Sequence, residues 1–289
     1  MKALISGGGG QLGRGLQRLV PEGIECTALQ RCDLDITDPR SVSETISRYR
    51  PDWIINAAAY TAVDRAEAEP DIAFAVNRDG VANLAIAARD IGARVLHVST
   101  DYVFDGRGGR PYRPDDAPAP LNVYGESKRE GEIRLAELLS GRHALVRASW
   151  LYGLPGRNFV SSMLKLMKEK QELRVVCDQV GSPTAVPGLV GAIWRIVERE
   201  AYGVYHWCDA GVASWYDFAV AIQAEANAQG LLSQAVRIIP VLSTEFPTAA
   251  LRPSFSVLDS VTSSRLLGFE LVHWRTRLSQ MLAGTRRPA

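Results

Sequence analysis

The chain has 289 residues, of which 46% are hydrophobic and 22% charged, and its formal net charge is +1. This composition is typical of a globular protein with one large domain or two, and the small charge gives no reason to expect a nucleic acid or membrane partner. No apolar run suggests a membrane span or a signal peptide, and four irregularly spaced cysteines indicate free thiols in a reducing cytoplasm. The four histidines are scattered singly, so we expect no metal site.

The N-terminus predicts a dinucleotide-binding turn. An apolar strand over 3–6 runs directly into a glycine-rich segment in which Gly7, Gly10 and Gly13 stand three residues apart, and a helical segment follows. Glycines let the backbone approach a pyrophosphate, whose charge is met by N–H groups at the start of the helix. The predicted cofactor contacts in this segment are Gly7, Gly10, Gln11, Leu12 and Gly13.

The end of the second predicted strand, 25–29, bears on the choice of cofactor. Dinucleotide folds that prefer NAD place an acidic residue there to hold the ribose 2′-hydroxyl. This chain has Gln30 and Arg31 instead, and a guanidinium can meet a 2′-phosphate. The sequence therefore favours NADPH, with NADH as the other candidate because Asp33 and Asp35 follow closely. The expected cofactor contacts here are Arg31, Asp33 and Leu34.

Strands and helices alternate from residue 1 to about 150, which predicts a doubly wound parallel sheet of the Rossmann type. Asp38 is the expected N-cap of a helix that has Pro39 at its first position. Small residues follow Asn56, where a cofactor has to pass close to the backbone. The predicted elements are a helix over 39–49, a strand over 52–56, a long helix over 72–90 closed by Gly92, and a strand over 95–99. Further predicted cofactor contacts are Ala57, Ala58 and Tyr60.

The candidate catalytic residues are Thr100, Tyr124 and Lys128. Thr100 ends the strand over 95–99, at the edge of a parallel sheet where ligands bind. Tyr124 and Lys128 stand four apart at the start of a helical segment over 126–139, so they share one face of a helical turn. An ammonium near a phenol is expected to lower the phenol pKa, and the three groups together form a proton-transfer device. A lone Tyr-x-x-x-Lys pair is also common on exposed helices, so its context decides.

The regular alternation stops after about residue 150. A strand over 203–207 is expected to return to the main sheet, and Ser214 is the expected N-cap of a helix over 216–226. A strand over 236–241 and helices over 262–267 and 274–282 follow. We predict a dinucleotide-binding domain over 1–150, joined by the returning strand, and a smaller α/β domain over 151–289 that binds the substrate.

These features together resemble those of the extended short-chain dehydrogenases/reductases, and within them the dTDP-4-dehydrorhamnose reductase family. The resemblance covers essentially the whole chain and is strongest before residue 160. The glycine turn and the Tyr-x-x-x-Lys pair are shared by the whole superfamily, whereas longer strings are more specific. These strings are Asn56-Ala57-Ala58-Ala59-Tyr60-Thr61-Ala62-Val63-Asp64, Ser99-Thr100-Asp101-Tyr102-Val103-Phe104-Asp105-Gly106 and Pro120-Leu121-Asn122-Val123-Tyr124-Gly125-Glu126-Ser127-Lys128.

The resemblance implies reduction of the C4 carbonyl of a dTDP-linked 6-deoxy-4-hexulose by NADPH. Tyr124 would protonate the carbonyl oxygen, Thr100 would orient it, and Lys128 would lower the Tyr124 pKa and hydrogen-bond the nicotinamide ribose. Trp150 could instead be a core-packing residue, and Arg252 could instead be an ordinary surface arginine. The substrate contacts that we expect are Asp101, Tyr102, Trp150 and Arg252.

Other interpretations stay open at this point. Some relatives use an acidic residue just after the glycine motif in a magnesium-bridged dimer, and this chain has Gly15 there, so we expect no such Mg²⁺ site and a monomer or homodimer. The regulatory β subunit of methionine adenosyltransferase is similar over the same motifs, and it acts as a binding partner and not as a reductase. A reductase of another dTDP-4-keto sugar, such as the one leading to dihydrostreptose, and an epimerase of the same fold are further alternatives.

Overall fold

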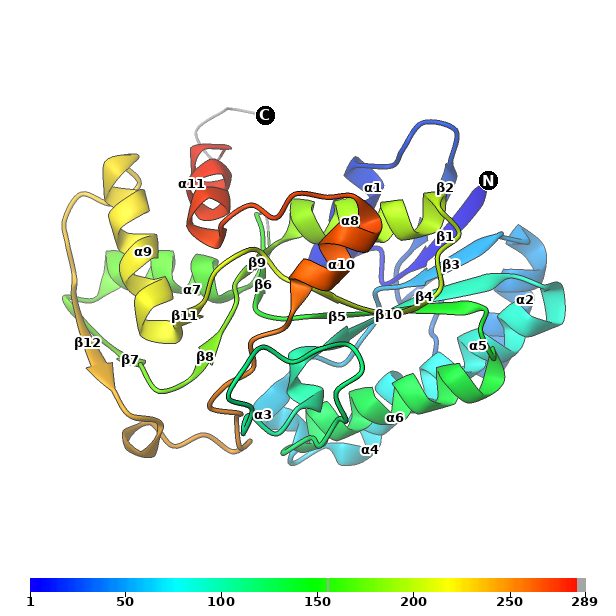
Figure 1. Cartoon of the computed structure of the whole chain (residues 1–289), viewed down its shortest axis with the longest axis horizontal. Helices are drawn as coiled ribbons and strands as arrows, with labels where there is room; N and C mark the ends of the chain where they lie inside the picture. Colours follow the sequence, from blue (N-terminus) through cyan, green and yellow to red (C-terminus); the bar gives the residue numbers. More distant parts are fainter. Residues whose placement is uncertain (155, 285–289) are drawn as a thin grey trace.

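The protein is described by a computed structural model, which covers residues 1–154 and 156–284 (Figure 1). Its centre is a six-stranded parallel sheet in the order β10-β5-β4-β3-β1-β2. The strands are β1 Lys2–Ser6, β2 Glu25–Leu29, β3 Trp53–Asn56, β4 Arg94–Thr100, β5 His143–Ala148 and β10 Gly203–Trp207. The Rossmann-type fold predicted from the alternating pattern is confirmed. The strand predicted over 203–207 is β10, and it pairs in parallel with β5.

Helices cover both faces of this sheet, as Figure 1 shows. One face is covered by α1 Gln11–Arg18 and α8 Val186–Glu198, whose apolar side chains join those of the sheet in a single core. The other face is covered by α2 Pro39–Tyr49, α5 Gly80–Ile91 and α6 Val123–Leu138. The inner strands β1, β3, β4 and β5 are therefore mostly buried, as a parallel sheet between two helical layers requires. Because α8 lies in the core of the main sheet, this part of the fold draws on residues well beyond 150.

A second group of elements packs beside the sheet, on the left of Figure 1. Its own apolar core is formed mainly by α7 Phe159–Glu169, α9 Trp215–Ala228 and α11 Trp274–Gly284. Beside them lies a parallel pair of strands, β7 Glu172–Val176 and β12 Arg237–Val241. The remaining elements are short: β6 Leu151–Tyr152 with β9 Thr184–Ala185, β8 Val180–Gly181 with β11 Ala213–Ser214, and α10 Ser260–Leu267.

The single helix predicted over 72–90 is interrupted. It consists of α4 Pro70–Phe74, a π-helical turn Ala75–Asp79 and α5, which ends at Gly92 in the left-handed conformation as predicted. The extra residue in the π-helical turn presents Asn77 to neighbouring segments, and such turns are common at functional sites. Helix α6 also begins earlier than predicted, because the Asn122 side chain accepts a hydrogen bond from the Gly125 N–H (2.8 Å) and caps it.

Three shorter elements complete the described chain: α3 Val63–Ala66 and two 3₁₀ turns, Asp101–Val103 and Ser243–Glu245. In the ranges 1–154 and 156–284, no helix is both long enough and apolar enough to cross a membrane.

Candidate functional site

A crevice of about 660 Å³ opens at the carboxyl ends of β1, β2 and β3, and the glycine turn forms part of its wall. Gly7 has a φ of +76°, and a Cβ there would lie 2.6 Å from the Ala58 nitrogen, so only glycine fits between the two loops. No side chain caps the start of α1 at Gly10, so its first N–H groups are free to face an anion. The crevice therefore fits a dinucleotide, with the pyrophosphate at α1.

Residues at the end of β2 line the rim of this crevice. Arg31, whose side chain is 79% exposed, lies 3.4 Å from the Asp35 carboxylate. Asp33 is turned back and accepts a hydrogen bond from the Gln30 N–H (3.3 Å). An exposed guanidinium at this position can contact a phosphate, as the sequence predicts. Leu34, Ala57, Ala58 and Tyr60 also line the crevice, whereas Leu12 and Gly13 are buried behind the glycine turn.

Thr100 and Tyr124 meet beside this crevice, at the end of β4. Thr100 is buried, and its hydroxyl donates to Asp101 (3.1 Å) and accepts from the Tyr102 N–H (3.2 Å). Burial raises the pKa of the Tyr124 phenol to about 12, hydrogen bonding by Thr100 opposes the rise, and the Asp101 charge adds to it. Tyr102 packs edge-on against Tyr124, with ring centroids 5.9 Å apart. The phenol is thus held protonated at neutral pH, in the state that can donate a proton.

In this cofactor-free chain Lys128 contacts a histidine and a backbone carbonyl. Its Nζ lies 3.1 Å from His97 Nε2 and donates to the Val98 carbonyl (2.6 Å), and the side chain is fully buried. Burial lowers the pKa of Lys128 to about 7, against the opposing charge of Glu132. Lys128 is not among the groups that shift the Tyr124 pKa here, and the expectation that it lowers this pKa stays a prediction. The phenol pKa is raised, because burial outweighs the opposing hydrogen bond to Thr100.

A buried ion pair fixes α6 to the sheet. Arg147 on β5 donates to both carboxylate oxygens of Glu132 on α6 (2.9 and 2.8 Å), and both side chains are nearly inaccessible. Burial alone would raise the pKa of Glu132, but the Arg147 guanidinium holds it below its usual value. Since Tyr124 and Lys128 lie on the same helix, this pair positions both of them. Neither partner was singled out from the sequence.

Asn77 is a second positioning residue that the sequence analysis missed. Its Oδ1 accepts from the Tyr60 N–H (2.9 Å), and its Nδ2 donates to the Tyr60 carbonyl and to Ser127 Oγ (both 3.0 Å). Asn77 therefore ties the crevice wall at Tyr60 to the catalytic helix. Gly131 allows this approach, because a side chain there would overlap the Asn77 carbonyl oxygen. The signal available in the sequence was an asparagine inside an otherwise apolar helical pattern.

Of the expected substrate residues, Arg252 lines a second cavity, of about 330 Å³. Arg252 makes a bidentate ion pair with Asp64 (2.9 and 2.7 Å) at its edge, so it is a paired residue and not a free surface arginine. Trp150 stacks on Trp215 with ring centroids 3.5 Å apart, in agreement with the packing alternative. The Tyr102 phenol lies close to Arg252, whose positive charge opposes the rise that burial causes in the Tyr102 pKa. The aromatic side chains that line the cavity, which the sequence analysis did not identify, are Phe159, Trp215 and Phe246.

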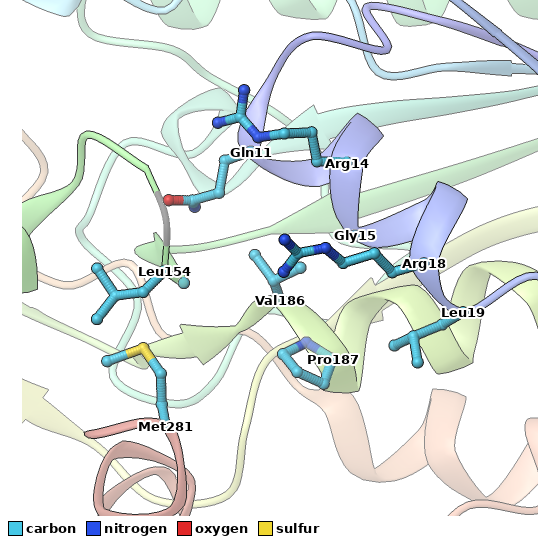
Figure 2. Close-up of a pocket in the computed structure, with 10 residues that line it drawn as sticks. Gln11, Arg14, Gly15, Arg18, Leu19, Leu154, Val186, Pro187 and Met281 are labelled. Atoms are coloured by element: carbon cyan, nitrogen blue, oxygen red, sulfur yellow. The ribbon is translucent and has the colours of Figure 1, made fainter. Parts of the chain in front are cut away.

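A third cavity, of about 250 Å³, lies between α1, the start of α8 and α11 (Figure 2). Figure 2 shows Gln11 and Gly15 of α1 at this cavity, with Val186 and Pro187 of α8 below them. The Gln11 side chain accepts a hydrogen bond from Asn158 (2.7 Å), so it faces this cavity and not the crevice. Gly15 packs against Val186, where a Cβ would come within 2.4 Å. Within the described ranges, three or more His, Cys, Asp or Glu side chains nowhere gather as a metal site would require.

Fold and site together define a Rossmann-type protein of the short-chain dehydrogenase/reductase class, with a dinucleotide crevice beside a Thr-Tyr-Lys group. Residues 1–287 match the family described as "RmlD substrate binding domain", and the chain belongs to this family. It is 42% identical to the spore coat polysaccharide biosynthesis protein SpsK of Bacillus subtilis, over 97% of this chain and 96% of that protein. The dTDP-4-dehydrorhamnose reductase of Aggregatibacter actinomycetemcomitans is also 42% identical, over 98% of both chains.

Solved structures agree with this assignment. The dTDP-4-dehydrorhamnose reductase of Bacillus anthracis in complex with NADP is 40% identical, with a TM-score of 0.92 over 98% of this chain and 99% of that chain. The UDP-glucose 4-epimerase of Thermus thermophilus has a TM-score of 0.86 but only 18% identity, so it shares the fold alone. The resemblance seen in the sequence is therefore confirmed.

Proposed function

We propose that this protein reduces the C4 keto group of dTDP-4-dehydro-L-rhamnose with NADPH and so forms dTDP-L-rhamnose. The observation that carries the proposal is the placement of the Tyr124 phenol at Thr100, at the sheet edge beside a crevice that fits a dinucleotide. The identity of 42% to a dTDP-4-dehydrorhamnose reductase over 98% of both chains supports the choice of substrate. A relative in complex with NADP supports the choice of NADPH over NADH.

Each group of the site has a defined part in this reaction. Bound NADPH supplies the hydride. Tyr124 donates its proton to the carbonyl oxygen as negative charge develops there, and Thr100 holds that oxygen and the phenol in line. Gly7, Gly10 and Gly13 shape the turn that holds the pyrophosphate, and Arg31 faces the 2′-phosphate.

The second group of elements provides the substrate side, so we keep the division near residue 150 as a functional proposal. The cavity beside Arg252 has aromatic walls that suit a base and a sugar, and two arginines, Arg174 and Arg252, that suit a diphosphate. Tyr102 joins the two sites, because it contacts both Tyr124 and Arg252. Asp101 lies one residue beyond Thr100 and is buried, so we propose that it acts on the phenol and the hydroxyl rather than on the sugar directly.

The test is NADPH oxidation, followed at the nicotinamide absorbance, with dTDP-4-dehydrorhamnose generated in place. Another dTDP-4-keto-6-deoxy sugar is assayed in parallel. We expect turnover with the first sugar and an identified dTDP-L-rhamnose product. Preferred turnover of the second sugar would reassign the substrate. If NADPH binds but no sugar is reduced, the reductase proposal fails, and the binding role known for the methionine adenosyltransferase β subunit becomes the better account.

A further inference from the structure

Four buried polar side chains form a line across the sheet that ends at the catalytic lysine. Ser6 on β1, Asn56 on β3 and His97 on β4 are register neighbours on adjacent strands, and all three are fully buried. Ser6 Oγ donates to Asn56 Oδ1 (2.8 Å), Asn56 Nδ2 lies 3.0 Å from His97 Nδ1, and His97 Nε2 lies 3.1 Å from Lys128 Nζ. None of these contacts belongs to the catalytic roles described above.

A backbone group sets the direction of every hydrogen bond in this line. The Ala58 N–H donates to Asn56 Oδ1 (3.1 Å), and a backbone N–H can only donate. The asparagine oxygen is therefore fixed on that side, and its NH₂ group points at His97 Nδ1. His97 Nδ1 must accept, so the neutral imidazole carries its single proton on Nε2 and directs it at Lys128.

An ammonium cannot accept that proton. Lys128 Nζ has a lone pair to offer only as a neutral amine, which would accept from His97 and donate to the Val98 carbonyl (2.6 Å). His97 cannot relieve the conflict by becoming a cation, because burial holds its pKa well below the usual value and a second proton on Nδ1 would point at the Asn56 NH₂ group. The remaining charged group near Lys128 within the described residues is Glu132 on its own helix, and this carboxylate is already paired with Arg147.

We infer that Asn56 and His97 hold Lys128 as a neutral amine in the cofactor-free protein, and that cofactor binding is coupled to uptake of one proton by Lys128. This inference rests on the proposed function only in that NADPH is the cofactor. A ribose hydroxyl can accept a hydrogen bond from an ammonium, whereas the protonated Nε2 of His97 cannot. When the Lys128 side chain turns from His97 to the ribose, nothing in its hydrogen bonding any longer requires a neutral amine. The proton comes from solvent, and no other bond forms or breaks. His97 is thus a positioning residue that sets the charge of Lys128.

The first test reads the histidine directly and needs no cofactor. In ¹⁵N-histidine-labelled, cofactor-free protein at pH 8.5, we expect His97 to show the spectrum of an imidazole protonated at Nε2. The resonance is assigned by its loss in His97→Gln. Protonation at Nδ1, or an imidazolium, would overturn the inference whatever the enzymatic activity.

The second test reverses the donor–acceptor direction of the hydrogen bonds from residue 56 to Lys128 by a nearly isosteric substitution. In Asn56→Asp the carboxylate accepts from Ser6, from Ala58 N–H and from His97, so His97 carries its proton on Nδ1 and Nε2 accepts from a Lys128 ammonium. The matched control is Ser6→Ala, which removes one donor to Asn56 while Ala58 N–H still fixes the direction. Calorimetric titration with NADPH at pH 8.5, in two buffers of different ionisation enthalpy, gives the number of protons taken up.

We expect about one proton per NADPH for the wild type and for Ser6→Ala, and close to none for Asn56→Asp, because Lys128 with a pKa of about 7 is almost wholly neutral at pH 8.5 in the free protein. NADPH binding without proton uptake in the wild type would overturn the inference and leave the proposed function intact. Absence of NADPH binding would instead contradict the proposed function. If Asn56→Asp does not fold, the histidine spectrum of the wild type still decides.

Discussion

Gly125 marks the closest approach between the catalytic helix and the segment that follows β4. A Cβ added at Gly125 would lie about 1 Å inside van der Waals contact with the Tyr102 carbonyl oxygen. Gly125→Ala therefore forces the first turn of α6, which carries Tyr124, away from Thr100 by a similar amount. A misplacement of about 1 Å costs roughly a hundredfold in rate when reacting groups must be aligned. Overpacking of this kind costs about 1–3 kcal/mol in stability, so the protein stays folded.

The assay for Gly125→Ala is kcat/KM for NADPH-dependent reduction, with the Kd for NADPH measured by fluorescence. We expect a loss of about a hundredfold in kcat/KM and a nearly unchanged Kd, because the glycine turn that holds the pyrophosphate is remote from Gly125. The matched control is Gly109→Ala, where a Cβ would meet nothing within 4 Å. A folded Gly125→Ala protein with the activity of the control would refute the claim that this contact positions Tyr124.

Three further predictions follow from buried groups and from the glycine turn. Arg147→Met leaves the buried Glu132 carboxylate with only the partly exposed Arg129 as a charged partner, so we expect a loss of about 3–5 kcal/mol in the free energy of unfolding. Most of this loss should be recovered when Glu132→Leu is added, and equal losses in the single and double variants would contradict the pairing. Burial raises the pKa of Asp101 to about 7, so its contribution to stability is present below about pH 4 and lost as pH rises through 7. The denaturation midpoint of Asp101→Asn should therefore fall less between pH 5 and 8 than that of the wild type. An equal fall in both proteins would contradict the raised pKa of Asp101. Gly7→Ala should weaken NADPH binding at least tenfold in equilibrium titrations, since a side chain there collides with the Ala58 backbone; an unchanged Kd would exclude the assigned cofactor turn.

The parallel sheet and the cofactor crevice could be predicted because short sequence patterns indicate their strands, helices and glycine turn. A strand, a glycine turn with a fixed spacing and a helix occur in sequence at 2–18, and the chemistry of the turn needs little information from distant residues. Asp38 and Ser214 likewise begin helices where the sequence predicts them, because capping is decided within four residues.

Longer-range packing explains what the sequence could not show. The π-helical turn at Asn77 exists because that side chain bridges Tyr60 and Ser127, which are distant in the chain. The raised pKa of Tyr124 and the lowered pKa of Lys128 depend on burial in the folded chain, which a Tyr-x-x-x-Lys spacing does not reveal.

The residues of the substrate cavity illustrate the same limit. The sequence alone does not distinguish a phosphate ligand from a surface residue at Arg252. Its ion-pair partner, Asp64, lies 188 positions earlier in the sequence, so no local pattern reveals the pair. Trp150 has a φ of +46° and stacks on Trp215, and neither feature has a local signature.

The most direct test of the account is NADPH oxidation with dTDP-4-dehydrorhamnose by the wild type, by Tyr124→Phe and by the control Tyr49→Phe, whose ring is exposed on α2 far from the site. Tyr124→Phe removes only the phenolic oxygen, so NADPH binding should persist. The account predicts turnover in the wild type and the control, and a loss of about a hundredfold or more in Tyr124→Phe, as for removal of a general acid. Equal turnover by all three proteins would contradict the assignment of Tyr124 as the proton donor.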